Sequence, residues 1–302
     1  MTRVHWLALL LLAGCAATAS PAPQACDVHK AAEIPLTLER GFITVPAKIE
    51  DKPVFMLIDT GSEGSVVTPA ASSALGLQPD RHHHTTIHGT GGAITAENAL
   101  LRSFEIGGME MLGESMAVSS LPSTHAAGLL GADWLADFDV ELDVAHQRMA
   151  LYRVEGCPDD HVPWPGRKAT LPARLTGRGL VLITAELDGH PVTALLDSGA
   201  LHTLLADGPA ARIGLDAAAL AGDPTGHARG IDGIERTVRR HRFARFRLGP
   251  ELYTNPVLLV GPLRSTTADM LLGLDWLRGN QVWISYSARR IAFQPQAIRQ
   301  AE

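Results

Sequence analysis

Apolar residues recur along this chain mainly at every second position, in short runs that end at turn signals. Residues 43–49 place apolar side chains at alternate positions, the pattern of a strand with one buried face. Residues 180–187 form a largely apolar run, typical of a strand, that ends at Asp188-Gly189, a pair typical of hairpin turns. Residues 56–58 and 194–196 are wholly apolar, as expected of strands buried on both faces. The pattern predicts an all-β protein.

The helices that the sequence allows are few and short. Two candidates cover residues 69–75 and 209–213. Two more begin at Asp133 and Asp275, each of which precedes a Trp-Leu pair. We interpret both aspartates as helix N-caps, because a side-chain carboxylate there can accept a hydrogen bond from a free backbone N–H group.

The second half of the chain repeats the first. Residues 54–62 (VFMLIDTGS) return 138 positions later as VTALLDSGA, and residues 129–135 (LLGADWL) return 142 positions later as LLGLDWL. Because the offset changes by only four residues, a duplicated domain is the simplest interpretation. We therefore expect one lobe over residues 34–154, a linker over 155–168, a second lobe over 169–295 and a tail over 296–302.

The composition narrows the class of protein. The chain has 302 residues, of which 46% are hydrophobic and 19% charged, so it can bury a large core rather than remain disordered. Its formal net charge is −6, and no basic run is interleaved with aromatic residues. A nucleic-acid partner is therefore not expected.

The N-terminal residues have the features of an export signal. Arg3 is followed by an apolar run over residues 6–13, which is too short to span a bilayer. The run leads into Leu-Ala-Gly-Cys, which resembles a bacterial lipobox and implies lipidation of Cys15. We expect a signal peptide over residues 1–14, a lipidated tether over 15–33 and a periplasmic, membrane-anchored protein. The alternative is an ordinary secretory signal that is cleaved within residues 16–19.

Two further cysteines fall outside the expected lobes. Cys26 precedes the first predicted strand, and Cys157 lies in the expected linker. Exported proteins often pair such cysteines, so we predict a Cys26–Cys157 disulfide. Two unpaired thiols remain the alternative, because the sequence does not show how far apart the Cα atoms are.

Two aspartates occupy positions where burial of a charged side chain would be unfavourable. Asp59 and Asp197 each end a wholly apolar strand, and Thr-Gly or Ser-Gly follows. A buried carboxylate needs compensation, which the glycine amide and the neighbouring hydroxyl can supply. One such triplet would indicate a structural turn. Two at the same place in a duplicated domain indicate a functional pair.

These motifs resemble those of the aspartic proteases. An apolar pair before Asp-Thr/Ser-Gly-Ser/Ala, followed about 70 residues later by Leu-Leu-Gly, is most similar to the retropepsin-like branch, here in tandem. The resemblance implies two all-β lobes related by a pseudo-twofold axis, with Asp59 and Asp197 facing each other in a cleft. It further implies that the residues after each aspartate support the active-site loops, namely Thr60, Gly61, Ser62, Ser198, Gly199 and Ala200.

Two facing carboxylates have a defined chemistry. They share one proton, so the ionised member can take a proton from a water molecule while the other donates to a carbonyl. No metal or other cofactor is needed, and the expected substrate is a polypeptide. We expect a monomer in which the two lobes of one chain pair, although pairing between chains is open. The alternative function is a non-catalytic peptide-binding or scaffold lipoprotein.

Glycine-rich loops lie at matching places in the two units. Residues 89–92 (GTGG) and 230–233 (GIDG) are 141 positions apart. The resemblance to retropepsins implies that both loops are flaps that close over substrate, whereas ordinary turns are the alternative. The residues concerned are Gly89, Thr90, Gly91, Gly92, Gly230, Ile231, Asp232 and Gly233.

A histidine cluster precedes the first loop. His82, His83 and His84 are consecutive, so on a strand they would point to opposite faces. That arrangement suits a single metal ion poorly. We interpret the cluster as part of a polar segment rather than a metal site.

Overall fold

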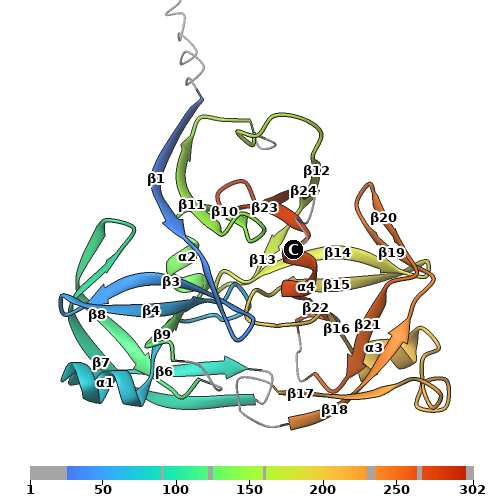
Figure 1. Ribbon diagram of the computed structural model, residues 1–302, viewed down its shortest axis with the longest axis horizontal. Helices are drawn as coiled ribbons and strands as arrows, with labels where there is room; N and C mark the ends of the chain where they lie inside the picture. The colour runs from blue at the N-terminus through green and yellow to red at the C-terminus, as the bar shows by residue number, and fades with distance from the viewer. Residues whose placement is uncertain are drawn as a thin grey trace, which may run out of the picture.

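The protein folds into two β-rich lobes that share a third sheet (Figure 1). The structure, a computed structural model, describes residues 26–89, 92–121, 125–158, 161–229, 235–263 and 267–296. Strands dominate these ranges, and the longest helix has 7 residues. The all-β prediction is confirmed. No helix in the described ranges combines the length and apolar character needed to cross a membrane.

Lobe one is built on an eight-stranded sheet in the order β2-β3-β4-β9-β5-β8-β7-β6. The alternation predicted for residues 43–49 appears in β3, where Ile43, Val45, Ala47 and Ile49 are buried. The strands are β2 (Thr37–Glu39), β3 (Phe42–Ile49), β4 (Lys52–Ile58), β5 (Val66–Val67), β6 (Gln78–Gly89), β7 (Gly92–Ile106), β8 (Met109–Val118) and β9 (Gly128–Leu130).

Lobe two repeats this plan in a larger sheet with the order β17-β18-β21-β16-β22-β15-β14-β19-β20, and β13 pairs with β14. Its strands are β13 (Arg174–Leu175), β14 (Val181–Leu187), β15 (His190–Leu196), β16 (Leu204–Ala206), β17 (Thr225–Arg229), β18 (Glu235–Arg242), β19 (Arg245–Leu248), β20 (Glu251–Thr254), β21 (Val257–Gly261) and β22 (Met270–Leu272). The duplication read from the sequence is thus a duplication of strand topology.

One parallel strand pair lies at the centre of each lobe. In lobe one, β4 runs parallel to β9, with Ile58 beside Leu130. In lobe two, β15 runs parallel to β22, with Leu196 beside Leu272. All four residues are buried, as expected for parallel strands covered on both faces. The backbone at the end of each strand pair is therefore held in a fixed position within its lobe.

The third sheet joins the lobes. Its order is β1-β11-β10-β23-β24-β12, so that three strands come from each half of the chain. The halves meet where β10 pairs antiparallel with β23, from Val140 beside Ile284 to Asp143 beside Gln281. The strands are β1 (Asp27–Pro35), β10 (Asp139–Asp143), β11 (Arg148–Glu155), β12 (Ala169–Pro172), β23 (Asn280–Ser285) and β24 (Arg290–Pro295).

A buried acidic residue lies at this junction. Glu141 of β10 is 2% exposed and stands beside Trp283 of β23. It accepts hydrogen bonds from the Tyr152 hydroxyl at 2.8 Å and from Nε2 of Gln281 at 2.6 Å, and it pairs with Arg148. Because its charge is neutralised and its oxygens have donors, Glu141 can remain inside the sheet that links the lobes.

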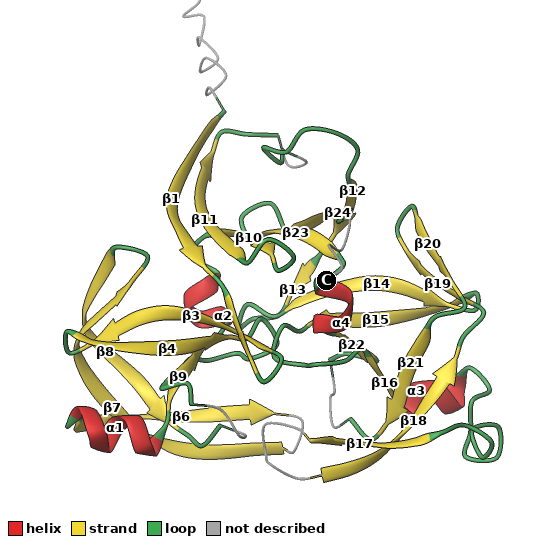
Figure 2. Ribbon diagram, in the orientation of Figure 1, coloured by secondary structure: helices red, strands yellow, loops and turns green. Residues whose placement is uncertain are grey.

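The helices are short and lie at matching places in the two lobes (Figure 2). Thr68 caps the first of them, since its hydroxyl accepts from the Ala71 amide, and Gly76 ends it with a φ of 69°. Two more directly follow the Leu-Leu-Gly segments. The helices are α1 (Pro69–Leu75), α2 (Ala132–Leu135), α3 (Asp207–Arg212) and α4 (Leu274–Leu277).

The predicted disulfide is present. Cys26 and Cys157 are bonded and lie 131 residues apart in the chain, so the bond ties the start of β1 to the segment after β11. The expected tether over residues 15–33 was too long, because residues 27–33 belong to β1. That strand pairs with β11 from Asp27 beside Glu155 to Pro35 beside Arg148. The folded chain therefore begins with a strand of the third sheet rather than with a free segment.

Candidate active site

Asp59 and Asp197 stand at the ends of the two central parallel pairs. Asp59 follows β4 directly, and its amide donates to the carbonyl oxygen of Leu130 at 3.0 Å. Asp197 follows β15, and its amide donates to Leu272 at the same distance. Each aspartate is therefore held by the Leu-Leu-Gly segment of its own lobe.

The two aspartate loops meet across the lobe boundary. A methyl group added to Gly61 would lie 2.4 Å from Cγ of Asp197, and one added to Gly199 would lie 2.4 Å from Cγ of Asp59. Any side chain at either glycine would overlap the opposite carboxylate. Each glycine amide also donates to its own aspartate, at 2.9 Å in both lobes. The glycines therefore make the approach of the two carboxylates possible and supply part of their hydrogen bonding.

A reciprocal set of hydrogen bonds fastens the loops together. The Thr60 hydroxyl donates to the carbonyl of Leu196 at 2.8 Å and accepts from the Ser198 amide at 3.0 Å. The Ser198 hydroxyl donates to the carbonyl of Ile58 at 2.8 Å and accepts from the Thr60 amide at 3.0 Å. Both residues are almost fully buried. The four bonds fix the loops with twofold symmetry, in the roles expected of Thr60 and Ser198.

Comparison with protein families agrees with this geometry. The profile described as aspartyl protease matches residues 45–134 and 183–276, which together make up more than half of the chain. Each matched segment contains one of the two aspartates. The chain belongs to the aspartyl protease family. A search of curated protein sequences gives no match.

Burial sets the protonation of the aspartyl protease dyad. Both carboxylates are buried, with 9% of Asp59 and 8% of Asp197 exposed. Desolvation raises the pKa of Asp59 to about 6, although hydrogen bonds from Gly61, Asp197 and other donors oppose the rise. Desolvation and then the negative charge of Asp59 raise the pKa of Asp197 well above its ordinary value. The pair therefore retains a proton under conditions in which an ordinary aspartate is ionised.

The residues after each glycine differ between the lobes. Ser62 donates from its hydroxyl to the carbonyl of Gly64 at 2.8 Å, within its own loop. Ala200 has no hydroxyl to do so. The Ser/Ala difference thus changes the hydrogen bonding within one loop, whereas the four bonds that Thr60 and Ser198 make across the lobe boundary keep the loops symmetric.

Asp133 and Asp275 are not N-caps, contrary to the sequence interpretation. Gly131 and Gly273 occupy those positions and provide no side-chain bond. Asp133 instead accepts from the amide and hydroxyl of Ser65, at 2.8 and 2.7 Å. The backbone enters each helix directly from the Leu-Leu-Gly strand, so the aspartate falls within the first turn and its side chain reaches the adjacent loop.

The second lobe repeats this bond with a different hydroxyl residue. Asp275 accepts from the amide and hydroxyl of Thr203, at 2.9 and 2.7 Å. The Thr203 hydroxyl in turn accepts from the amide of Gly273 at 3.2 Å. Sequence reasoning missed Ser65 and Thr203, although both lie six residues after a dyad aspartate. That repeated hydroxyl at an offset of 138 residues was the available signal.

Two described strand pairs flank the predicted flap segments. In lobe one β6 pairs with β7 as far as Gly89 beside Gly92, and in lobe two β17 pairs with β18 as far as Arg229 beside Glu235. The described strands of both hairpins extend from opposite lobes towards the middle of the molecule (Figure 1). The remaining predicted flap residues lie outside the described residues: Thr90, Gly91, Gly230, Ile231, Asp232 and Gly233.

The histidine cluster lies on the first of these hairpins. Residues 81–84 are exposed, and the pairing of β6 with β7 shifts register between Asp80 and His84. The Asp80 carboxylate accepts from the His82 amide and contacts Nδ1 of His83 at 2.7 Å. The cluster thus protrudes as a bulge that one aspartate holds in place.

The loop cross-link predicts a large stability effect. Thr60→Val keeps the shape of the side chain but leaves the buried Leu196 carbonyl and Ser198 amide without their partner. We expect the free energy of unfolding to fall by about 2–4 kcal/mol, the cost of two unsatisfied buried groups. Urea titration measures this change. Thr86→Val, at an exposed strand position, is the matched control and should change stability by less than about 0.5 kcal/mol.

The raised pKa values predict that removal of one dyad carboxylate stabilises the folded protein at neutral pH. Asp59→Asn should raise the free energy of unfolding at pH 7 by on the order of 2 kcal/mol and change it little at pH 3. The folded dyad holds its proton more tightly than an unfolded aspartate of pKa about 3.9, so its contribution is most favourable below pH about 4. That contribution is lost as the pH rises to about 6. Urea titrations of both proteins from pH 3 to 7 measure the difference, and a constant difference would contradict the argument.

Proposed function

We propose that this protein is an aspartic endopeptidase that cleaves polypeptides with Asp59 and Asp197. The observation that carries the proposal is the reciprocal approach of the two carboxylates, each of which lies where a side chain on the opposite glycine would be. Family membership supports the same reaction class. The raised pKa values are what a pair that shares one proton requires.

The two carboxyl groups divide the work of hydrolysis. The ionised member removes a proton from a water molecule, whose oxygen attacks the carbonyl carbon of the peptide bond. The protonated member donates its proton to the carbonyl oxygen, which gives a tetrahedral diol. Return of a proton to the peptide nitrogen then breaks the C–N bond. The dyad titrates as a unit, so either aspartate can take either role.

Two flaps, one from each lobe, would place the enzyme in the retropepsin-like branch of the family. Support comes from the two hairpin stems, which occupy matching places in the lobes. We propose that the loops at residues 89–92 and 230–233 act as two flaps. We also propose a monomeric enzyme, because the shared sheet and the loop cross-links already pair the two lobes of one chain.

We further propose that the enzyme acts outside the cytoplasm, held by a lipid on Cys15 at the periplasmic face of a bacterial membrane. The lipobox-like residues 12–15 motivate this assignment. The Cys26–Cys157 disulfide supports export, because such bonds persist in oxidising compartments.

Removal of either carboxylate tests the catalytic proposal. Asp59→Asn and Asp197→Asn should each reduce kcat by at least about a thousandfold on an unfolded protein substrate, since one carboxyl group cannot serve as both base and acid. The measurement is cleavage at several pH values between 3 and 7. Both variants should remain folded, because Asn preserves the shape of the side chain and removes a buried charge.

Two results would contradict the mechanism. Near wild-type cleavage by either variant would show that the aspartates do not act together. Peptide binding by the wild-type protein without any cleavage would favour the non-catalytic alternative, a peptide-binding or scaffold lipoprotein. A dyad-directed inhibitor that mimics the tetrahedral diol should block cleavage by the wild-type protein.

Substitution of the lipidation site tests the anchor. Cys15→Ser should prevent lipid attachment, so the protein should leave the membrane fraction or accumulate unprocessed. Fractionation and mass measurement of the mature chain distinguish these outcomes. Unchanged membrane retention with normal processing would rule out Cys15 as the anchor, and Cys26→Ser serves as a control that retains the lipid site.

A further inference from the structure

The disulfide between Cys26 and Cys157 has surroundings that suit a reaction. Cys26 is exposed, and Cys157 lines a pocket of about 200 Å³. His161 lines the same pocket, and its Nδ1 atom lies 3.8 Å from Sγ of Cys26. We propose that this group is a thiol–disulfide exchange site, in which a thiol from solvent attacks Cys157 and His161 assists the departure of Cys26.

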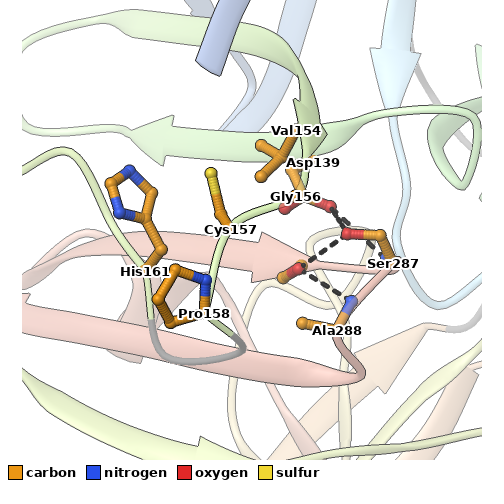
Figure 3. A pocket seen from close by; sticks show the side chains of 9 residues that line it. Asp139, Val154, Gly156, Cys157, Pro158, His161, Ser287 and Ala288 are labelled. Atoms are coloured by element: carbon orange, nitrogen blue, oxygen red, sulfur yellow. Dashed lines mark hydrogen bonds between the residues drawn. The ribbon is translucent and has the colours of Figure 1, made fainter. Parts of the chain in front are cut away.

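The pocket gives an attacking thiol a place to bind next to Cys157. Besides Cys157 and His161, its lining includes Asp139 from β10 and Ser287 and Ala288 from the turn between β23 and β24. Figure 3 shows the Cys157 sulfur at this pocket, with His161 on one side and Ala288 below. Ser287 is exposed, so the pocket is within reach of solvent. These residues do not belong to the dyad loops, and the site is therefore separate from the proposed hydrolytic one.

The position of His161 selects the leaving group. An imidazole N–H at Nδ1 can donate to the sulfur of Cys26 as negative charge develops there, and a better stabilised thiolate leaves faster. The attacked sulfur is then that of Cys157, which faces the pocket. The pocket thus offers a binding space next to the attacked cysteine, while His161 stabilises the charge on the departing one.

The exchange is balanced by two thiols. A thiolate attacks Sγ of Cys157 and forms a mixed disulfide with it. The S–S bond to Cys26 breaks, its electron pair stays on the Cys26 sulfur, and that sulfur takes up a proton. A second thiol attacks the sulfur of the first thiol in the mixed disulfide. Cys157 is released as a thiol, and the two external thiols leave as one disulfide. Two electrons and two protons pass from the thiols to the protein. While the sulfurs are bonded to each other, neither offers a thiolate to a metal, so we assign redox chemistry to Cys26, Cys157 and His161 rather than metal binding.

The bond controls how the beginning of the chain is attached. The pairing of β1 with β11 begins at Asp27 beside Glu155, directly next to the disulfide. Reduction would remove the covalent link at the end of this edge strand and leave its ladder with β11 and the packing of Val28. We therefore expect reduction to loosen the first residues of β1, through which the proposed membrane tether enters the folded protein.

The test compares reduction rates of the native, full-length protein. Glutathione and 2-mercaptoethanol serve as probes, and free thiols are trapped by alkylation and counted by mass. His161→Asn should lower the second-order rate constant by about fivefold or more, because the leaving thiolate loses its donor. His190→Asn, an exposed histidine at the start of β15, is the matched control and should react at the wild-type rate.

A second variant tests the pocket without changing the histidine. Ala288→Leu narrows the pocket that Cys157 lines, so it should slow glutathione more than the smaller 2-mercaptoethanol. Circular dichroism checks that each variant is folded. Equal rates for wild type and His161→Asn would overturn the proposal, as would reduction that occurs only under unfolding conditions. Because the readout is the number of thiols, the result does not depend on whether the dyad cleaves peptides.

Discussion

The structure depends on keeping two carboxyl groups in contact with each other inside a protein. Bringing Asp59 and Asp197 together removes both from water, and the raised pKa values express the cost. Glycine beside each aspartate makes room for the opposite carboxylate, and the glycine amides supply hydrogen bonds. The threonine and serine between them hold the two loops in register. Every residue of the repeated triplet therefore has a role that the mutual approach of the aspartates explains.

The surrounding sheets hold the two aspartates in contact. Each aspartate extends from a buried parallel strand pair, so its position relative to its own lobe is fixed. The lobes are then joined by the antiparallel pairing of β10 and β23 in the shared sheet. A sheet with strands from both halves resists separation of the lobes, because separation would expose backbone groups of both central strands. The proposed chemistry thus relies on a scaffold that brings two independently formed loops to one place.

Duplication produced two similar lobes, but not identical ones. Glu141 of the first half and Trp283 of the second occupy equivalent positions and lie beside each other in the shared sheet. The carboxylate is satisfied by Arg148, Tyr152 and Gln281, whereas the indole packs with Tyr152 and with Trp164 from the linker. The disulfide with its neighbouring histidine likewise belongs to one end of this sheet only. These asymmetric features lie away from the dyad loops, where the twofold pattern of hydrogen bonds is retained.

The sequence alone determined the fold class, the duplication and the two aspartates, because each leaves a local, repeated pattern: alternating apolar residues, collinear segments, and a carboxylate after a buried run. It also predicted the disulfide, although it left free thiols open. Only the tertiary structure decided that residues 27–33 form a strand, since their partner β11 lies more than a hundred residues away. It likewise decided that Asp133 and Asp275 bind Ser65 and Thr203 rather than cap helices. Such contacts join residues that are distant in the chain, so the alternation of apolar and polar residues does not indicate them. Only the repeated hydroxyl six residues after each dyad aspartate pointed to Ser65 and Thr203, and it did not name their partners.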